Sequence, residues 1–112
     1  MSNLKERINA DLKSAMLARD ELTTQTLQGL KSAILYEEVA KKVRETGLDE
    51  QSIEQVIARE VKKRDEAAEL FQKGGNTASA EKERAEKQVL AAYLPEQMSE
   101  AELAVVVAEV VA

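Results

Sequence analysis

The sequence predicts an all-α protein with no sheet, and three observations support this. Ala, Glu, Lys, Leu, Gln and Arg dominate the 112 residues, and these are strong helix formers. Aromatic residues make up only 3% of the chain, whereas β-sheet cores favour aromatic and β-branched side chains. Apolar residues also recur at helical spacing. We therefore expect a helical hairpin followed by further helices, about five in all.

The first two helices are expected to form the hairpin. Residues 3–18 carry a narrow apolar stripe, and Asp20 is the predicted N-cap of a long second helix that reaches about residue 44 or 45. Its apolar residues form two roughly opposite arcs: Leu27, Leu30 and Ile34 in one, and Ala33, Tyr36, Ala40 and Val43 in the other. A helix with two apolar faces is expected to pack between neighbours.

The third helix is predicted over residues 50–73. Gly47 suits the left-handed conformation that ends a helix, and Asp49 is the expected N-cap of the next one. Gly74 and Gly75 end the third helix, because glycine adopts a positive φ at little cost.

A fourth helix is predicted over residues 78–92, capped by Asn76 or Thr77. Pro95 then interrupts the helical pattern. Ser99 and Glu102 have the spacing of a capping box, which predicts a fifth helix with an apolar stripe from Leu103 to Val111.

The fifth helix reaches the last residue with its stripe unfinished and without a C-cap. An apolar, valine-rich face normally has a partner. We therefore expect that a further helical module is truncated or missing. The alternative is that this helix folds back onto the fourth helix.

The composition argues against catalysis by this chain and against a resident cofactor. The sequence has no His and no Cys, so the commonest general base, the commonest metal ligand and the thiol nucleophile are absent. No serine lies in a nucleophile elbow, and no convergent group of carboxylates suggests a metal site. The absence of cysteine, of a signal-peptide pattern and of a membrane-spanning apolar run predicts a cytoplasmic protein.

The net negative charge of the chain argues against a general anion-binding surface and allows only a local basic patch. The net charge is −5; residues 1–75 hold 13 basic and 14 acidic side chains, and residues 76–112 hold 3 and 7. Nonspecific binding of nucleic acid needs a basic surface. Any such surface would have to lie in the first two thirds of the chain.

Two groups of basic residues are candidates for phosphate contacts. Four project from the outer face of the third helix: Arg59, Lys62, Lys63 and Lys73. Three cluster at the predicted end of the second helix: Lys41, Lys42 and Arg44. The alternative is an ordinary solvated face, because Glu66 and Glu69 share the outer face of the third helix and no aromatic residue is interleaved for base stacking.

Glu60 and Arg64 fall on the apolar face of the third helix, four residues apart. We expect a structural ion pair, within reach of a second carboxylate on the second helix such as Glu37 or Glu38. A charged groove that receives a ligand is the functional alternative.

Two stretches carry a resemblance to a known family. They are VIAREVKKRDEAAELFQKGG at 56–75 and AEKQVLAAYLPEQMSEAEL at 85–103. Both resemble the GatB/YqeY family, which includes free-standing YqeY-like proteins and the tail domain of the GatB subunit of aspartyl/glutamyl-tRNA amidotransferase. On this resemblance, residues 1–94 are the N-terminal helical portion, and residues 95–112 are a linker and the start of the C-terminal module.

The resemblance implies a function linked to glutamine-dependent tRNA amidation, the reaction of a carbon-nitrogen ligase. In the amidotransferase the tail domain grips tRNA, and catalysis belongs to other domains. The resemblance therefore implies a non-catalytic module whose partners are tRNA or amidotransferase subunits. A different hypothesis is a helical module that docks another protein, or a second copy of itself, through Leu103 to Val111 or through the helical hairpin.

Overall fold

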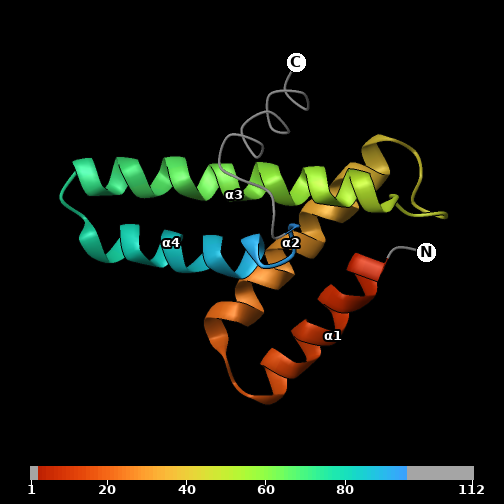
Figure 1. The fold of residues 1–112 in the computed structure, drawn as a ribbon, viewed down its shortest axis with the longest axis horizontal. Coiled ribbons are helices and arrows are strands. Elements are labelled where there is room, and N and C mark those ends of the chain that lie inside the picture. Colours follow the sequence, from red (N-terminus) through yellow and green to blue (C-terminus); the bar gives the residue numbers. More distant parts are fainter. Residues whose placement is uncertain (1–2, 96–112) are drawn as a thin grey trace. The chain divides into compact units, whose positions relative to one another are not determined.

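The computed structural model describes residues 3–95, which form four α-helices and no strand (Figure 1). These are α1 (Asn3–Leu17), α2 (Glu21–Ala40), α3 (Glu50–Lys73) and α4 (Thr77–Ala91). The all-α prediction is confirmed. The predicted fifth helix lies outside the described residues.

The chain divides into two compact units, Met1–Val56 and Ile57–Ala112. In the first unit α1 and α2 pack as a hairpin (Figure 1). In the second unit the remainder of α3 and α4 run antiparallel (Figure 1). Side chains buried in the first unit include Ile8, Leu27, Leu30 and Ile53; those in the second include Ile57, Val61, Ala80 and Leu90.

Three predicted N-caps are present. The Asp20 side chain accepts the Thr23 N–H, Asp49 accepts the Ser52 N–H, and Asn76 accepts the Ser79 N–H. Each bond satisfies a backbone donor that the first turn of a helix leaves unpaired. Hydrogen bonds from Thr23 and Ser52 to the charged carboxylates lower the pKa of Asp20 and of Asp49.

The predicted end of the second helix is wrong. The helix ends at Ala40, because Lys42 adopts φ +59° and turns the chain. The Lys42 N–H donates to Val39 O and the Val43 N–H to Glu38 O, the bonding pattern of a Schellman motif. The motif usually has glycine at this left-handed position, so a lysine there gave no signal in the sequence. Gly47 does have a positive φ, but within the following loop.

The two apolar arcs predicted for the second helix differ in burial, and Ala33 and Val43 of the second arc are half-buried. Leu27, Leu30 and Ile34 are buried as predicted. In the opposite arc Tyr36 is 77% exposed and Ala40 is exposed. One face of the C-terminal half of α2 therefore carries exposed apolar side chains.

Gly29 and Gly75 allow a matched test of the backbone conformation, helical at the first and left-handed at the second. A Cβ at Gly29, within α2, or at Gly75, after α3, would have no neighbour within 4 Å, but Gly75 has φ +81°. We expect Gly29→Ala to raise the free energy of unfolding by about 0.5–1 kcal/mol, since alanine is the better helix former. Gly75→Ala should lower it by about 1–2 kcal/mol, the cost of a left-handed residue with a Cβ. Urea unfolding measures both, and equal effects would contradict the assigned backbone.

Candidate nucleic-acid interface

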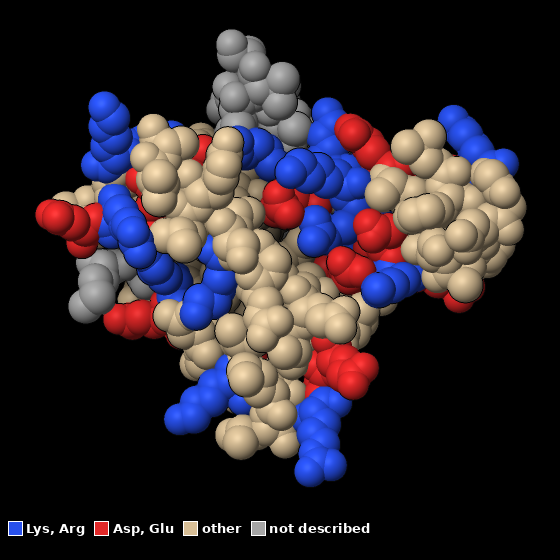
Figure 2. Space-filling view, turned by 180° about the vertical axis from the view of Figure 1, so that it is seen from behind, with Lys and Arg blue, Asp and Glu red and all other residues tan. Residues whose placement is uncertain are grey.

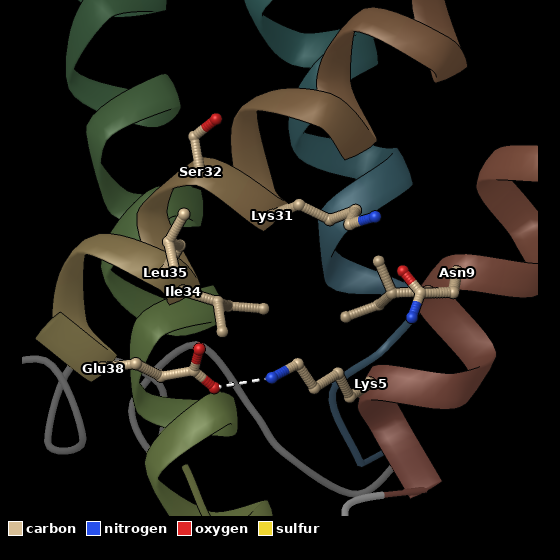
Figure 3. Close-up of a pocket in the computed structure, with 8 residues that line it drawn as sticks. Lys5, Asn9, Lys31, Ser32, Ile34, Leu35 and Glu38 are labelled. Atoms are coloured by element: carbon tan, nitrogen blue, oxygen red, sulfur yellow. Dashed lines mark hydrogen bonds and ion pairs between the residues drawn. The ribbon is translucent and has the colours of Figure 1, made fainter. Parts of the chain in front are cut away.

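A buried carboxylate organises the first unit. Glu38, on α2, is only 3% exposed. Its Oε2 lies 2.7 Å from the Lys5 Nζ of α1 and accepts the Leu48 backbone N–H at 3.1 Å (Figure 3). A Cβ at Gly47 would lie 3.4 Å from the same oxygen, so the loop passes close to this ion pair. One side chain thereby links α1, α2 and the loop of residues 41–49.

The surroundings of Glu38 favour its charged form. Burial by itself raises the pKa of a carboxyl group. Here the hydrogen bonds from Lys5 and from the Leu48 N–H, together with the positive charges of Lys5 and Arg44, outweigh that effect and leave the pKa of Glu38 lowered. Glu38 therefore stays ionised at neutral pH, although it is almost fully buried.

A hollow of about 260 Å³ lies beside this ion pair, between α1 and α2 (Figure 3). Ile8, Ile34 and Leu35 form its apolar wall, and Lys5, Lys31 and Asn9 add polar groups. Lys31 has no ion-pair partner among residues 3–95. Sequence reasoning missed this hollow, because Lys5 and Glu38 are 33 positions apart and no local pattern joins them.

The three basic residues expected at the end of the second helix lie instead in the loop after it. Lys41 Nζ lies 3.8 Å from Glu37 Oε2. Lys42 and Arg44 are exposed and have no ion-pair partner within the described part of the chain. They line a second hollow together with Val39 of α2 and the exposed Glu45. Two basic side chains are thus available to an anionic ligand.

The exposed surface of residues 22–44 is poor in acidic groups. Among the residues between Glu21 and Glu45, the only carboxylates are Glu37 and Glu38. Glu38 is buried and Glu37 is partly buried beside Lys41. The exposed positions are neutral or basic: Gln25, Gln28, Gly29, Lys31, Ser32, Leu35, Tyr36, Val39, Ala40, Lys41, Lys42 and Arg44. We call these twelve positions the α2 face. It stands out in a chain of net charge −5.

The basic residues of α3 lie in a different setting. Lys62 Nζ is 4.0 Å from Glu66 Oε1, and Lys63 Nζ is 3.3 Å from Glu60 Oε2. Arg59 is half-buried and also has interaction partners, whereas Lys73 is exposed at the end of the helix. Figure 2 shows basic and acidic side chains interspersed over the face that it draws. Around α3 the positive charges are therefore largely balanced.

Glu60 and Arg64 lie together in the second unit, both largely buried. Arg64 Nη1 is 2.9 Å from Glu60 Oε1, and Arg64 Nε is 3.6 Å from Glu86 Oε1 of α4. A second carboxylate facing Arg64 is thus Glu86 of α4, and the expected approach of Glu37 or Glu38 stays a prediction. Lys87 of α4 lies 2.8 Å from Asp65 and adds another link between the two helices. This arrangement ties α3 to α4.

Residues 3–95 contain no group of three or more acidic side chains placed to hold a metal ion. Within the same range, no helix is both long and apolar enough to cross a membrane. What the described part of the chain offers is a helical surface with exposed cations.

The fold and this surface define a small all-α protein with a potential anion-binding face. The chain matches the family model of YqeY-like proteins over residues 5–112. It therefore belongs to the YqeY-like family, and the resemblance stated from its sequence is confirmed.

Three relatives illustrate the range of this similarity. The chain is 31% identical to Altered inheritance of mitochondria protein 41, mitochondrial, of Lachancea thermotolerans, covering 84% of this chain and 47% of the relative. It is 31% identical to the protein of that name in Eremothecium gossypii, covering 78% and 46%. A protein of Schizosaccharomyces pombe named only as uncharacterised is 34% identical, covering 87% and 76%. The chain spans about half the length of the first two.

The predicted cytoplasmic location is contradicted by these relatives, because two of them are named as mitochondrial proteins. The inference relied on the absence of cysteine and of a signal-peptide pattern. A chain without cysteine suits any reducing compartment, so its composition does not single out the cytoplasm.

Replacing Glu38 tests the link between the helices and the loop. We expect Glu38→Gln to lower the free energy of unfolding at pH 7 by about 1–3 kcal/mol, because the Lys5 ion pair is lost and the hydrogen bond from Leu48 is weakened. A lowered carboxyl pKa stabilises the fold above the unfolded-state pKa, and this contribution is lost as pH falls through the folded-state pKa. The difference between wild type and variant should therefore shrink in acid.

The control is Glu45→Gln, which changes an exposed carboxylate in the same loop. Its effect should stay within about 0.5 kcal/mol. Urea unfolding between pH 3 and pH 7 compares the three proteins. Equal stability of Glu38→Gln and wild type at pH 7 would show that the Glu38 contacts do not stabilise the fold.

Proposed function

We propose that this chain is a non-catalytic helical module that binds tRNA through backbone phosphates, with Lys42 and Arg44 as the main contacts. The observation that supports this most is the pair of exposed cations at the end of the α2 face, which have no ion-pair partner within residues 3–95; the exposed Glu45 lies in the same hollow. Lys41 adds a third positive charge nearby. The tRNA ligand is suggested by the resemblance to the tail domain of the amidotransferase, and with it a link to glutamine-dependent tRNA amidation.

The geometry favours the loop over α3 as the contact surface. A phosphate must compete with Glu66 for Lys62 and with Glu60 for Lys63. Lys42 and Arg44 form no ion pair within residues 3–95, so a phosphate there meets only the more distant charges of Glu38 and Glu45. Phosphate contacts give affinity without reading the base sequence, so discrimination would come from the shape of the RNA. Arg59, Lys62, Lys63 and Lys73 remain secondary candidates.

A second candidate function is docking of another protein, such as an amidotransferase subunit or a second copy of this chain. The exposed apolar side chains of Leu35, Tyr36 and Val39 favour it. The stripe from Leu103 to Val111, the first candidate surface for this role, lies outside the described residues. Sedimentation at several protein concentrations tests self-association, which Val39→Lys should weaken if the α2 face is the interface.

Charge removal in the loop tests tRNA binding. Lys42→Gly/Arg44→Gln removes both cations, and glycine suits the left-handed position, so the turn should remain folded. We expect weaker tRNA binding and a slope of log K against log salt that is smaller in magnitude by about 1.4–1.8, since each of the two phosphate contacts contributes about 0.7–0.9. Fluorescence anisotropy with labelled tRNA across a salt series measures both quantities.

The matched comparison is Lys62→Glu/Lys63→Glu, which reverses two charges on α3. We expect it to weaken binding less than the loop variant does. If the loop variant binds as tightly as wild type, Lys42 and Arg44 do not contact the RNA. If wild type binds no tRNA even at low salt, the proposed function is wrong.

A further inference from the structure

Tyr36 is an exposed aromatic ring that the fold of the described residues does not use. It is 77% exposed, whereas Tyr93 is buried. An aromatic side chain left in water gives up a large apolar surface that could be buried. The exposure of Tyr36 therefore suggests that its ring contacts a binding partner.

The neighbours of Tyr36 form an apolar platform. Leu35 is 44% exposed and Val39 is 54% exposed. Residues three and four apart are neighbours on a helix surface, so Val39 lies beside both Leu35 and Tyr36. These three side chains make a continuous patch within the α2 face.

Cations lie near both ends of this platform. Leu35 borders the first hollow together with Lys31, and Val39 borders the second hollow together with Lys42 and Arg44. Lys31 extends from α2 on the side of the platform that faces α1 (Figure 3). At about 1.5 Å per residue, roughly 14 Å of helix separates Lys31 from the end of α2. Tyr36 lies about midway along that length.

We infer that the α2 face binds unpaired nucleotides, with one base stacked on Tyr36 and a neighbouring phosphate near Lys42 and Arg44. An exposed aromatic ring on α2, followed by the basic side chains of Lys42 and Arg44, supplies the two requirements of single-stranded nucleic acid, a stacking platform and positive charge; Glu45 is the exposed carboxylate in the same hollow as these two cations. This inference rests on the proposed function and narrows it. The contacted part of the RNA is a loop or an end in which bases are free to stack.

The ring requires an unpaired base, because a duplex stacks its bases against each other and hides their faces. Stacking on an aromatic side chain tolerates any base. The α2 face is therefore expected to prefer single-stranded over double-stranded RNA and to show little preference among sequences. Lys42 and Arg44 alone would contact the phosphates of either form.

Tyrosine fluorescence reports directly on this contact. The chain has no Trp and two Tyr, of which Tyr93 is buried, so quenching by a bound base reports mainly on Tyr36. We expect saturable quenching of the full chain by decauridylate, and much weaker quenching by the same strand annealed to decaadenylate. In Tyr36→Phe the quenching should disappear, while anisotropy of labelled decauridylate still shows binding, because phenylalanine also stacks.

Tyr36→Ala removes the ring. We expect about tenfold weaker binding of decauridylate, the loss typical of one aromatic stacking contact. Leu17→Ala is the control, since Leu17 is 78% exposed at the end of α1 and lies off the α2 face. It should bind as wild type does. Circular dichroism confirms that all variants keep their helical content.

The outcomes separate this inference from the proposed function. If Tyr36→Ala binds decauridylate as tightly as wild type, while Lys42→Gly/Arg44→Gln still weakens tRNA binding, the stacking inference is wrong and the phosphate-binding function stands. If Tyr36→Ala abolishes self-association in sedimentation and decauridylate causes no quenching, the α2 face is a protein interface and the inference is overturned. If wild type binds neither decauridylate nor tRNA, both proposals fall.

Discussion

The contact between the Glu38 carboxylate, the Lys5 ammonium and the Leu48 backbone N–H is the constraint on which the first unit depends. A buried carboxylate is costly unless it is paired and hydrogen-bonded, and both requirements are met on a single oxygen. The ion pair with Lys5 fixes where α1 lies along α2, and the hydrogen bond from Leu48 fixes how the loop of residues 41–49 returns toward the helices. The same burial withdraws an acidic charge from the surface of α2.

The conformation of the loop follows from how α2 ends. Lys42 has a left-handed backbone, which costs a residue with a Cβ roughly 1–2 kcal/mol. Arg19, just after α1, has the same conformation, and Gly75 after α3 has it without that cost. At Lys42 the strained backbone places a cation at the turn itself. Together with Arg44 it forms the basic end of the α2 face.

What the sequence predicted was determined by local chemistry. The bounds of α3 and the caps at Asp20, Asp49 and Asn76 follow from residues within a few positions of one another. The end of α2 was missed because the left-handed residue is a lysine, whereas the C-terminal end of a helix is usually recognised in a sequence by a glycine at that position. Local patterns also cannot show which acidic residues are buried.

The candidate site was predicted only as a set of residues. The sequence marked all seven basic side chains in two groups, but it could not show which of them pair with carboxylates. Our proposal favours Lys42 and Arg44 because Lys62 and Lys63 pair with carboxylates and Glu38 is buried. Tyr36 was assigned to a packed arc, and only its observed exposure makes it a candidate contact.

The most direct test of this account is the Leu48 amide signal in a proton–nitrogen NMR spectrum recorded across pH. Because that N–H donates to Glu38, its chemical shift should follow the titration of Glu38. We expect one inflection at a pKa below that of an ordinary glutamate, about 4.3, and none in Glu38→Gln. A Leu48 signal that does not change with pH, or that changes at the ordinary pKa, would show that Glu38 does not hold the loop.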